Sequence, residues 1–189
     1  MSAVAQRTSA DGSSTLARAF PEREAGEWYV LHTLSRQEKA LAEELSNLGI
    51  AYFLPLVRQV RYYGRRKVEV ELPLFGCYLF LRGSREDAFR ADRTRRVANI
   101  LTVCDQDRLD WELRNLHLAL SRNAVLDPYP YLVHGARVQV RAGPFRGLEG
   151  IVDVRVKPNR LILQVEMLGR AVSLEVDAAL LDVVEASAA

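Results

Sequence analysis

A glycine-rich segment near the C-terminal end constrains the fold of this chain most. Residues 143–150 contain three glycines, a proline and a phenylalanine, and lie between segments 137–140 and 151–154, in which apolar and polar residues alternate. An alternation with a period of two predicts half-buried strands. Glycine permits a positive φ or a close approach of two backbones, and proline presets φ for a turn. The segment therefore predicts a tight loop joining two strands, longer than the two-residue turn of a simple hairpin.

The residues that follow this loop predict a small β domain. Segments 161–166, 171–176 and 180–184 are further strand candidates, and Gly169 marks a turn between the first two. Five short strands within about fifty residues suit a small barrel. From Asn123 onward the chain has seven basic and eight acidic residues. We therefore do not expect this domain to bind nucleic acid through bulk charge.

The first two thirds of the chain alternate between strand and helix signals. Ser35 and Glu38 have the spacing of a capping box at a helix start, and Ser84 begins a second helix with two acids in its first turn. The expected strands are 28–32, 50–60, 67–72, 73–82 and 97–103, and the expected helices are 35–48, a short one after 84, and 107–121. This order predicts a sheet with helices packed on one side.

Two strands near the middle predict a β-hairpin with a basic and aromatic tip. Pro55 points to an edge or a bulge in the first strand, and Tyr62, Tyr63 and Gly64 form the turn. The cations between residues 58 and 67 are Arg58, Arg61, Arg65, Arg66 and Lys67, with no acid among them. Such a tip can pair with phosphates and stack on bases, although a solvated edge that resists aggregation has the same composition.

The strand at 73–82 separates its side chains onto two faces. One face carries Cys77, Leu79 and Leu81, and the other carries Tyr78, Phe80 and Arg82. Aromatic residues with arginine are enriched in interface hot spots. Large aromatic side chains are nevertheless usually buried, so the residues alone favour burial of this face under a helix.

Length and composition permit one or two domains, because 189 residues with 49% hydrophobic content can form one large or two small cores. The net charge of +2 does not by itself indicate a nucleic-acid partner.

Cys77 and Cys104 are expected to be free, buried or half-buried thiols in a reducing cytoplasm, with a disulfide as the alternative. No apolar run reaches the roughly 18 residues of a membrane span. Residues 1–26 are expected to be a disordered tail, with an organelle transit peptide as the rival.

The sequence offers no marker of catalysis. His32, His117 and His134 share no metal-ligand spacing with each other or with the cysteines. The glycine-rich segment leads into a strand, whereas a phosphate-binding loop opens a helix. We therefore expect a protein that is not an enzyme and needs no cofactor or metal.

The glycine loop with its flanking strands resembles a KOW motif, with the residues Gly135, Gly143, Pro144, Phe145, Gly147 and Gly150. Together with Trp28-Tyr29-Val30 and the strand at 73–80, this motif resembles the NusG family of transcription elongation factors over residues 27–185. The Leu-Phe-x-x-Tyr-Leu-Phe sequence and the short connection between the domains resemble the specialised RfaH-like and UpxY-like antiterminators more than housekeeping NusG. Housekeeping NusG and a ribosome-associated or RNA-binding KOW protein are the alternatives, and the near-neutral charge argues against the latter.

The resemblance implies an α+β protein in two domains. The N-terminal α/β sandwich with an antiparallel-rich sheet would span 27–122, a linker would span 123–134, and a small SH3-like β-barrel, the KOW domain, would span 135–185. RfaH-like relatives can fold this last segment as a helical hairpin instead.

The resemblance also implies partners, and a role in suppressing pausing or termination. Contact with the clamp helices of the largest RNA polymerase subunit falls to Leu74, Phe75, Tyr78 and Phe80. Contact with non-template or upstream DNA falls to Arg36, Arg95 and Arg96, in addition to the hairpin residues Arg61, Arg65, Arg66 and Lys67. The KOW domain would recruit a termination factor or a ribosomal protein. We expect a monomer in the cytoplasm, without a membrane partner.

Overall fold

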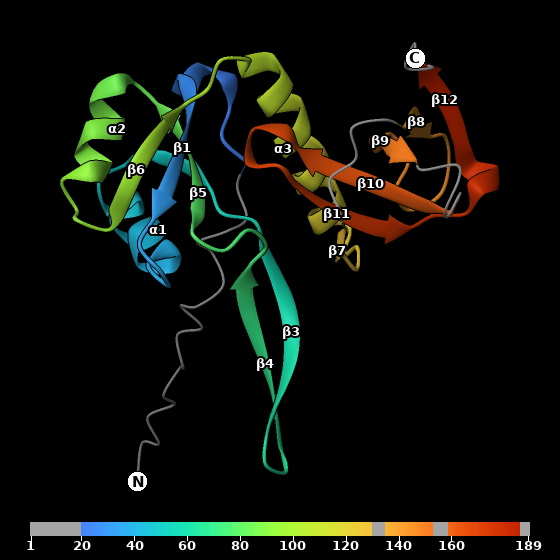
Figure 1. Cartoon of the computed structure of the whole chain (residues 1–189), viewed down its shortest axis with the longest axis horizontal. Helices are drawn as coiled ribbons and strands as arrows, with labels where there is room; N and C mark the ends of the chain where they lie inside the picture. Colours follow the sequence, from blue (N-terminus) through green and yellow to red (C-terminus); the bar gives the residue numbers. More distant parts are fainter. Residues whose placement is uncertain (1–19, 130–134, 153–158, 186–189) are drawn as a thin grey trace, which may run out of the picture.

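The computed structural model of the chain describes residues 20–129, 135–152 and 159–185. Its strands form a four-stranded sheet, a two-stranded hairpin and a six-stranded C-terminal sheet. Figure 1 shows the hairpin projecting from the body, while one long helix lies between the two larger sheets.

The four-stranded sheet is antiparallel, with the order β2-β5-β1-β6. Its strands are β1 (Glu27–Thr33), β2 (Ala51–Phe53), β5 (Tyr78–Gly83) and β6 (Val97–Thr102). Val30 and Leu31, neighbours on the central β1, are both fully buried although they point to opposite faces. Both faces of this sheet therefore need a cover.

Helices supply that cover on both faces, so the expectation of helices on one side is wrong. Leu31 and the β5 residues Leu79 and Leu81 share a core with α1 (Glu38–Asn47) and α2 (Arg85–Asp92). On the other face, Val30 and Phe80 share a core with α3 (Gln106–Ser121). The order of elements did not show that α3 crosses to the opposite face.

The two short helices begin differently. Ser84 caps α2 as expected, because its Oγ accepts from the Asp87 amide at 3.2 Å while Asp87 Oδ2 accepts from the Ser84 amide at 3.0 Å. The capping box expected at Ser35 and Glu38 is wrong, since the N-cap of α1 is Gln37 and no side chain caps it. The Glu38 carboxylate instead accepts from the Cys77 amide at 2.6 Å, which ties α1 to the turn before β5.

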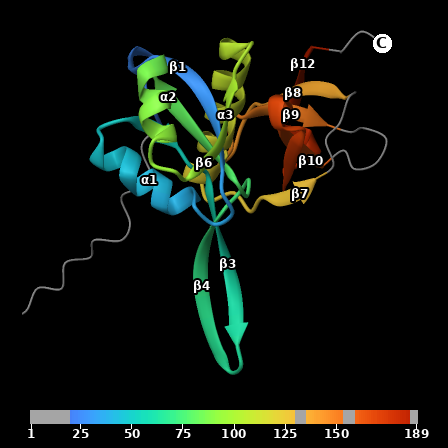
Figure 2. The same cartoon turned by 60° about the vertical axis from the view of Figure 1, so that its left-hand side comes forward.

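The hairpin consists of β3 (Leu56–Tyr63) and β4 (Arg66–Pro73), paired along their whole length. Figures 1 and 2 both show it standing clear of the helices and of the C-terminal sheet. The single strand expected at 50–60 is divided by Leu54 and Pro55 into β2 and β3. The Leu74 amide donates to the Pro55 carbonyl at 2.8 Å and closes the base of the hairpin.

The C-terminal sheet has the order β12-β8-β9-β10-β11-β7 and is antiparallel. Its strands are β7 (Asp127–Tyr129), β8 (Ala136–Val140), β9 (Glu149–Val152), β10 (Arg160–Val165), β11 (Arg170–Glu175) and β12 (Leu181–Glu185). Within the described residues β7 and β12 do not pair, so no closed barrel is formed there. β7 comes from the segment expected to be the linker. The 3-10 turns η2 (Glu166–Leu168) and η3 (Ala178–Leu180) connect the last strands, and no helical hairpin is found in the described part.

The first described residues also differ from the sequence-based expectation. Phe20 packs against Trp28 and Phe53, with ring centroids 5.6 Å and 5.3 Å apart, and a short 3-10 turn, η1 (Arg23–Ala25), leads into β1. Residues 20–26 are thus attached to the body by an aromatic contact. The remainder of the expected tail, residues 1–19, lies outside the described residues.

The glycine-rich segment forms the loop between β8 and β9, as expected. Gly143 and Gly147 have φ values of 83° and 84°, and the Gly147 amide donates to the Val140 carbonyl at 2.8 Å. Gly150 lies in β9, where a Cβ would stand 2.6 Å from the carbonyl oxygen of Ile162 on β10. The loop therefore needs glycine for conformation and β9 needs it for close pairing.

The Gly150→Ala variant is expected to lose about 1–3 kcal/mol of unfolding free energy, because β9 and β10 must separate to admit the methyl group. Chemical denaturation followed by circular dichroism measures this loss. Gly76→Ala is the matched control, since a Cβ there meets nothing within 4 Å. Equal stability of the two variants would contradict the close-approach account.

Candidate protein- and nucleic-acid-binding surfaces

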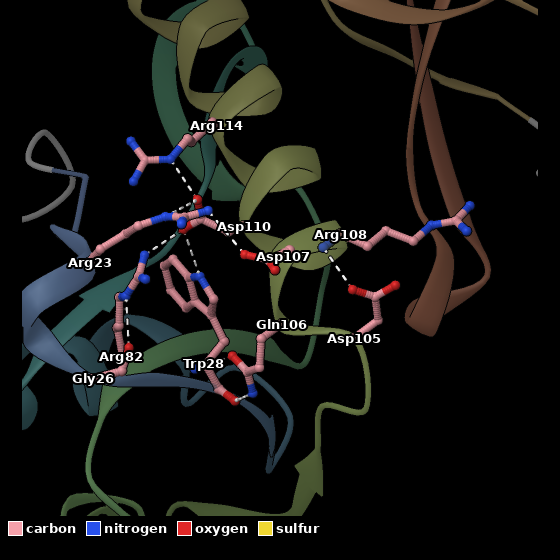
Figure 3. Close-up of polar contacts among 10 residues, drawn as sticks. All are labelled: Arg23, Gly26, Trp28, Arg82, Asp105, Gln106, Asp107, Arg108, Asp110 and Arg114. Carbon is pink, nitrogen blue, oxygen red and sulfur yellow. Dashed lines mark hydrogen bonds and ion pairs between the residues drawn. The ribbon is translucent and has the colours of Figure 1, made fainter. Parts of the chain in front are cut away.

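Asp110 holds α3 against the four-stranded sheet (Figure 3). Its side chain is 5% exposed and accepts hydrogen bonds from Trp28 Nε1 at 3.0 Å, from Arg114 Nε at 2.6 Å and from Arg82 Nη1. Burial alone would raise the pKa of Asp110, but the hydrogen bonds from Arg114, Trp28 and Arg82 outweigh it and hold the pKa below its usual value. The carboxylate is therefore ionised at neutral pH and joins β1, β5 and α3.

Further contacts reinforce this attachment at the start of α3. The Gln106 side chain accepts from the Trp28 amide at 2.7 Å and donates to the Trp28 carbonyl at 3.0 Å. Arg82 Nε donates to the Gly26 carbonyl at 3.0 Å, and its guanidinium lies 4.9 Å from the centroid of the Trp28 ring. The helix is thus fixed over Trp28 in one orientation (Figure 3).

The aromatic residues predicted to bind a partner lie mainly in the core under α3. Phe80 is fully buried and Phe75 is 5% exposed, and their ring centroids are 6.4 Å apart. Leu74 and Tyr78 are half-buried and reach the surface. Burial of Phe80, which the residues alone favoured, is therefore found. The resemblance assigned partner contacts to Phe75 and Phe80, but both side chains are buried in this structure.

A surface groove of about 900 Å³ lies next to this cluster. It runs between the base of the hairpin, the C-terminal end of α3 and the segment leading to β7, and its apolar lining includes Phe53, Leu54, Leu120, Val125 and Leu126. Phe53 lines the groove and also stacks near Phe80, with ring centroids 6.4 Å apart. His117, also in the lining, has its pKa lowered by burial and by the charge of Arg114, so it is neutral at pH 7. The lining also contains charged residues, among them Lys39, Arg58 and Glu71, and the apolar part of the groove adjoins the aromatic cluster.

The predicted nucleic-acid residues fall into two groups. Arg36 and Arg95 are exposed in two turns that the hydrogen bond from the Leu34 amide to the Arg96 carbonyl, 2.8 Å, holds together. Arg96 differs from them, because its Nε lies 2.6 Å from Glu44 Oε1 and its Nη1 donates to Gln37. The second group is exposed on the hairpin and forms no ion pair in the described part of the chain; it comprises Arg61, Arg65, Arg66 and Lys67.

The outer side of α3 carries contacts with the C-terminal sheet that were not predicted from the sequence. Trp111 Nε1 donates to Glu149 Oε2 at 3.1 Å, and the Glu149 amide donates to Asn115 Oδ1 at 2.9 Å. Arg137 stacks on the Trp111 ring, 4.2 Å from its centroid. The predicted KOW loop therefore packs on α3 through its Glu149 end. In the sequence, the only signal for this contact was that Trp111 and Asn115 lie beside the apolar stripe of the expected helix.

Glu112 completes this contact between α3 and the C-terminal sheet. Both carboxylate oxygens accept from the Glu166 amide, at 3.3 and 3.2 Å, and Arg108 pairs with both Glu112 and Glu166. Burial raises the pKa of Glu112 to about 7, although the Glu166 amide and Arg108 act in the opposite direction. Burial therefore keeps Glu112 protonated to a higher pH than an ordinary glutamate, against the effect of these two partners.

The described residues contain neither a metal-binding cluster nor a membrane-spanning helix. No group of three or more His, Cys, Asp or Glu side chains is placed to hold a metal within residues 20–129, 135–152 and 159–185. Among these same residues, no helix is long and apolar enough to cross a membrane. Cys77 and Cys104 are free, as expected, but Cys104 is exposed rather than buried.

Part of the chain is similar to a known protein family. Residues 26–109, from the start of β1 to the first turn of α3, match the family model described as "Transcription termination factor nusG". This part of the chain is similar to the NusG family. No curated protein sequence matches the chain.

Three solved structures align with most of the chain. A Thermotoga maritima NusG structure that describes a domain interaction has 19% identity over 84% of this chain and 97% of that chain, with a TM-score of 0.40. Conformations A and B of the MjSpt4:Spt5 complex have 16% and 17% identity over 84% of this chain, and cover 99% and 97% of those chains. Their TM-scores are 0.27 and 0.28.

We predict that Asp110→Asn lowers the unfolding free energy by about 3–5 kcal/mol, because it leaves the buried Arg82 without a charged partner. Asp107→Asn is the control: Asp107 is 88% exposed, and its 3.0 Å pair with Arg23 is expected to contribute less than about 1 kcal/mol. Urea denaturation of both variants measures the difference. Similar losses would show that Asp110 is no more important than a surface acid.

A second prediction concerns pH. The pKa of Glu112 is about 7 in the folded protein against an ordinary value of 4.5, so its contribution to stability is lost as the pH rises from about 4.5 through 7, by up to about 3 kcal/mol. Glu112→Gln carries no such charge, so its unfolding free energy should rise relative to that of the wild type over this range. Denaturation at pH 5 and pH 8 compares the two. If the unfolding free energy of the variant instead falls relative to that of the wild type at pH 8, the ionised carboxylate is the favoured form.

Proposed function

We propose that this protein is a transcription elongation factor that binds RNA polymerase and suppresses pausing or termination, as an RfaH-like or UpxY-like member of the NusG family. The match of residues 26–109 to the NusG family carries the proposal. The NusG-family domain and its exposed cations support a binding role, and no catalytic step is part of the proposal.

Tyr78, Leu74 and the neighbouring groove form the proposed contact with the clamp helices of the largest polymerase subunit. An apolar groove beside aromatic side chains suits the apolar face of a helix, and such a helix reads the groove through side chains spaced one turn apart. Phe75 and Phe80 support this surface from below, because both are buried directly beneath it. Their role in the proposal is to position Tyr78 and Phe53.

The exposed cations form the proposed contact with non-template or upstream DNA. Arg36 and Arg95 supply one patch and the hairpin supplies the other, whereas the Arg96 guanidinium is already paired with Glu44. The domain would thus bridge the polymerase cleft while it holds DNA, so that the clamp resists opening at pauses.

The C-terminal sheet is the proposed KOW domain, an SH3-like barrel over residues 135–185 that recruits a termination factor or a ribosomal protein. Support comes from the loop between β8 and β9, which holds four of the six predicted KOW residues, with Gly150 in β9 and Gly135 directly before β8. We propose that the protein acts as a monomer in the cytoplasm, where it meets polymerase.

Tyr78→Ala is expected to weaken binding to purified bacterial core RNA polymerase about 5- to 30-fold, the effect of losing a hot-spot aromatic residue. Val125→Arg should weaken it as well, because Val125 lines the groove and is 80% exposed, so that folding is spared. Phe80→Ala is unsuitable, since loss of a buried phenylalanine destabilises the fold itself by about 3–5 kcal/mol. Biolayer interferometry measures binding, and a paused-elongation assay measures pause lifetime.

Tyr62→Ala provides the matched control, because it removes an exposed tyrosine from the hairpin tip and should leave binding to nucleic-acid-free polymerase unchanged. Wild type should shorten pauses, and Tyr78→Ala should not. If the wild-type protein neither binds polymerase nor alters pausing, the proposed function fails, and a ribosome-associated or RNA-binding role becomes the leading alternative.

A further inference from the structure

The pairing register of the hairpin assigns its side chains to two faces. Directly opposed residues of two strands lie on the same face, and successive residues alternate between faces. The register pairs Arg58 with Glu71, Val60 with Glu69 and Tyr62 with Lys67; we call this the acid-bearing face. It pairs Gln59 with Val70 and Arg61 with Val68, and places Arg66 on this same side; we call this the acid-free face.

The two faces of the hairpin differ in net charge. On the acid-bearing face, Arg58 and Lys67 are balanced by Glu69 and Glu71, and Arg58 Nε lies 3.4 Å from Glu71 Oε1. On the acid-free face, Arg61 and Arg66 are exposed and no acid opposes them. The hairpin therefore presents positive charge to one side only.

The acid-free face also carries an apolar row that neither larger sheet covers in the described part of the chain. Val68 and Val70 are half-buried on it, and Val57 and Leu72 continue the row toward the base. Figures 1 and 2 show the ribbon standing free of both larger sheets. Charged side chains that only protect strand edges from pairing need not be sorted by face. Sorting of the charges by face indicates a polyanionic partner on one side.

We propose that the acid-free face of the β3–β4 hairpin binds duplex DNA. Arg61 and Arg66 would contact phosphates, and the valine row would face the major groove of the DNA. Strands of eight residues give the ribbon a reach of about 26 Å, and a major groove about 12 Å wide admits a two-stranded ribbon. The two glutamates on the other face would be repelled by phosphates, which sets the orientation. This inference refines the DNA contact of the proposed function, but it concerns the free protein and does not require polymerase.

The test is the salt dependence of binding of the full chain to a fluorescently labelled duplex, measured by anisotropy. Each phosphate contact contributes about one unit to the slope of log K against log salt concentration. Arg61→Gln/Arg66→Gln should therefore reduce the slope by about two and the affinity at low salt at least about 10-fold. Arg58→Gln/Lys67→Gln removes the same charge from the acid-bearing face and should reduce the slope by less than about one.

Circular dichroism confirms that both variants fold, which is expected because all four side chains are exposed. Equal losses in the two variants would overturn the proposal, because attraction would then be independent of the face. Absence of wild-type binding, or tighter binding to a single strand or to RNA of the same sequence, would overturn it as well. Binding of the same variants to core polymerase separates the two claims: DNA binding that is lost while polymerase binding persists concerns the hairpin alone.

Discussion

The ionised Asp110 carboxylate is the interaction on which the arrangement of this protein depends. It is almost fully buried, and its hydrogen bonds reach Trp28 on β1, Arg82 on β5 and Arg114 on its own helix. A buried carboxylate without such partners would be strongly destabilising, so α3 has one orientation in which all of these donors are satisfied. Any other placement of α3 would cost the carboxylate these hydrogen bonds.

The position of α3 in turn determines both surfaces of interest. Its inner side covers Phe80, and its C-terminal end forms one wall of the apolar groove. Its outer side receives Glu149 and Glu166 of the C-terminal sheet. A change at Asp110 would accordingly reach the groove and the contact with the C-terminal sheet, although neither includes that residue. Beyond its base, which lines the same groove as the end of α3, the hairpin stands clear of this helix (Figures 1 and 2).

The sequence predicted local structure well and tertiary relations less well. The glycine loop, the start of α2 at Ser84 and the basic hairpin depend on short-range patterns, and the structure has all three. The capping role of Glu38 was wrong, because a long-range partner, the Cys77 amide, competes for the carboxylate. The prediction that all helices pack on one side of the sheet was wrong for α3, because the order of elements does not specify a face.

The candidate site shows the same division. Alternation correctly placed Tyr78 and Phe80 on the face opposite Leu79, and burial of Phe80 followed from its size and apolar character. Its predicted exposure came from resemblance alone. The pairing of Arg96 with Glu44 depends on two elements that are distant in sequence, and so does the contact of Trp111 with Glu149. No local pattern reports such contacts.

The most direct test of the account is site-specific photo-crosslinking from position 78 to a bacterial transcription elongation complex. A photoreactive phenylalanine at this half-buried site preserves the aromatic ring and samples only its immediate neighbours. The account predicts one dominant crosslink, to the clamp helices of the largest polymerase subunit, with a much weaker product from the same probe at position 62. Crosslinks to ribosomal proteins, or none to polymerase from position 78, would contradict it.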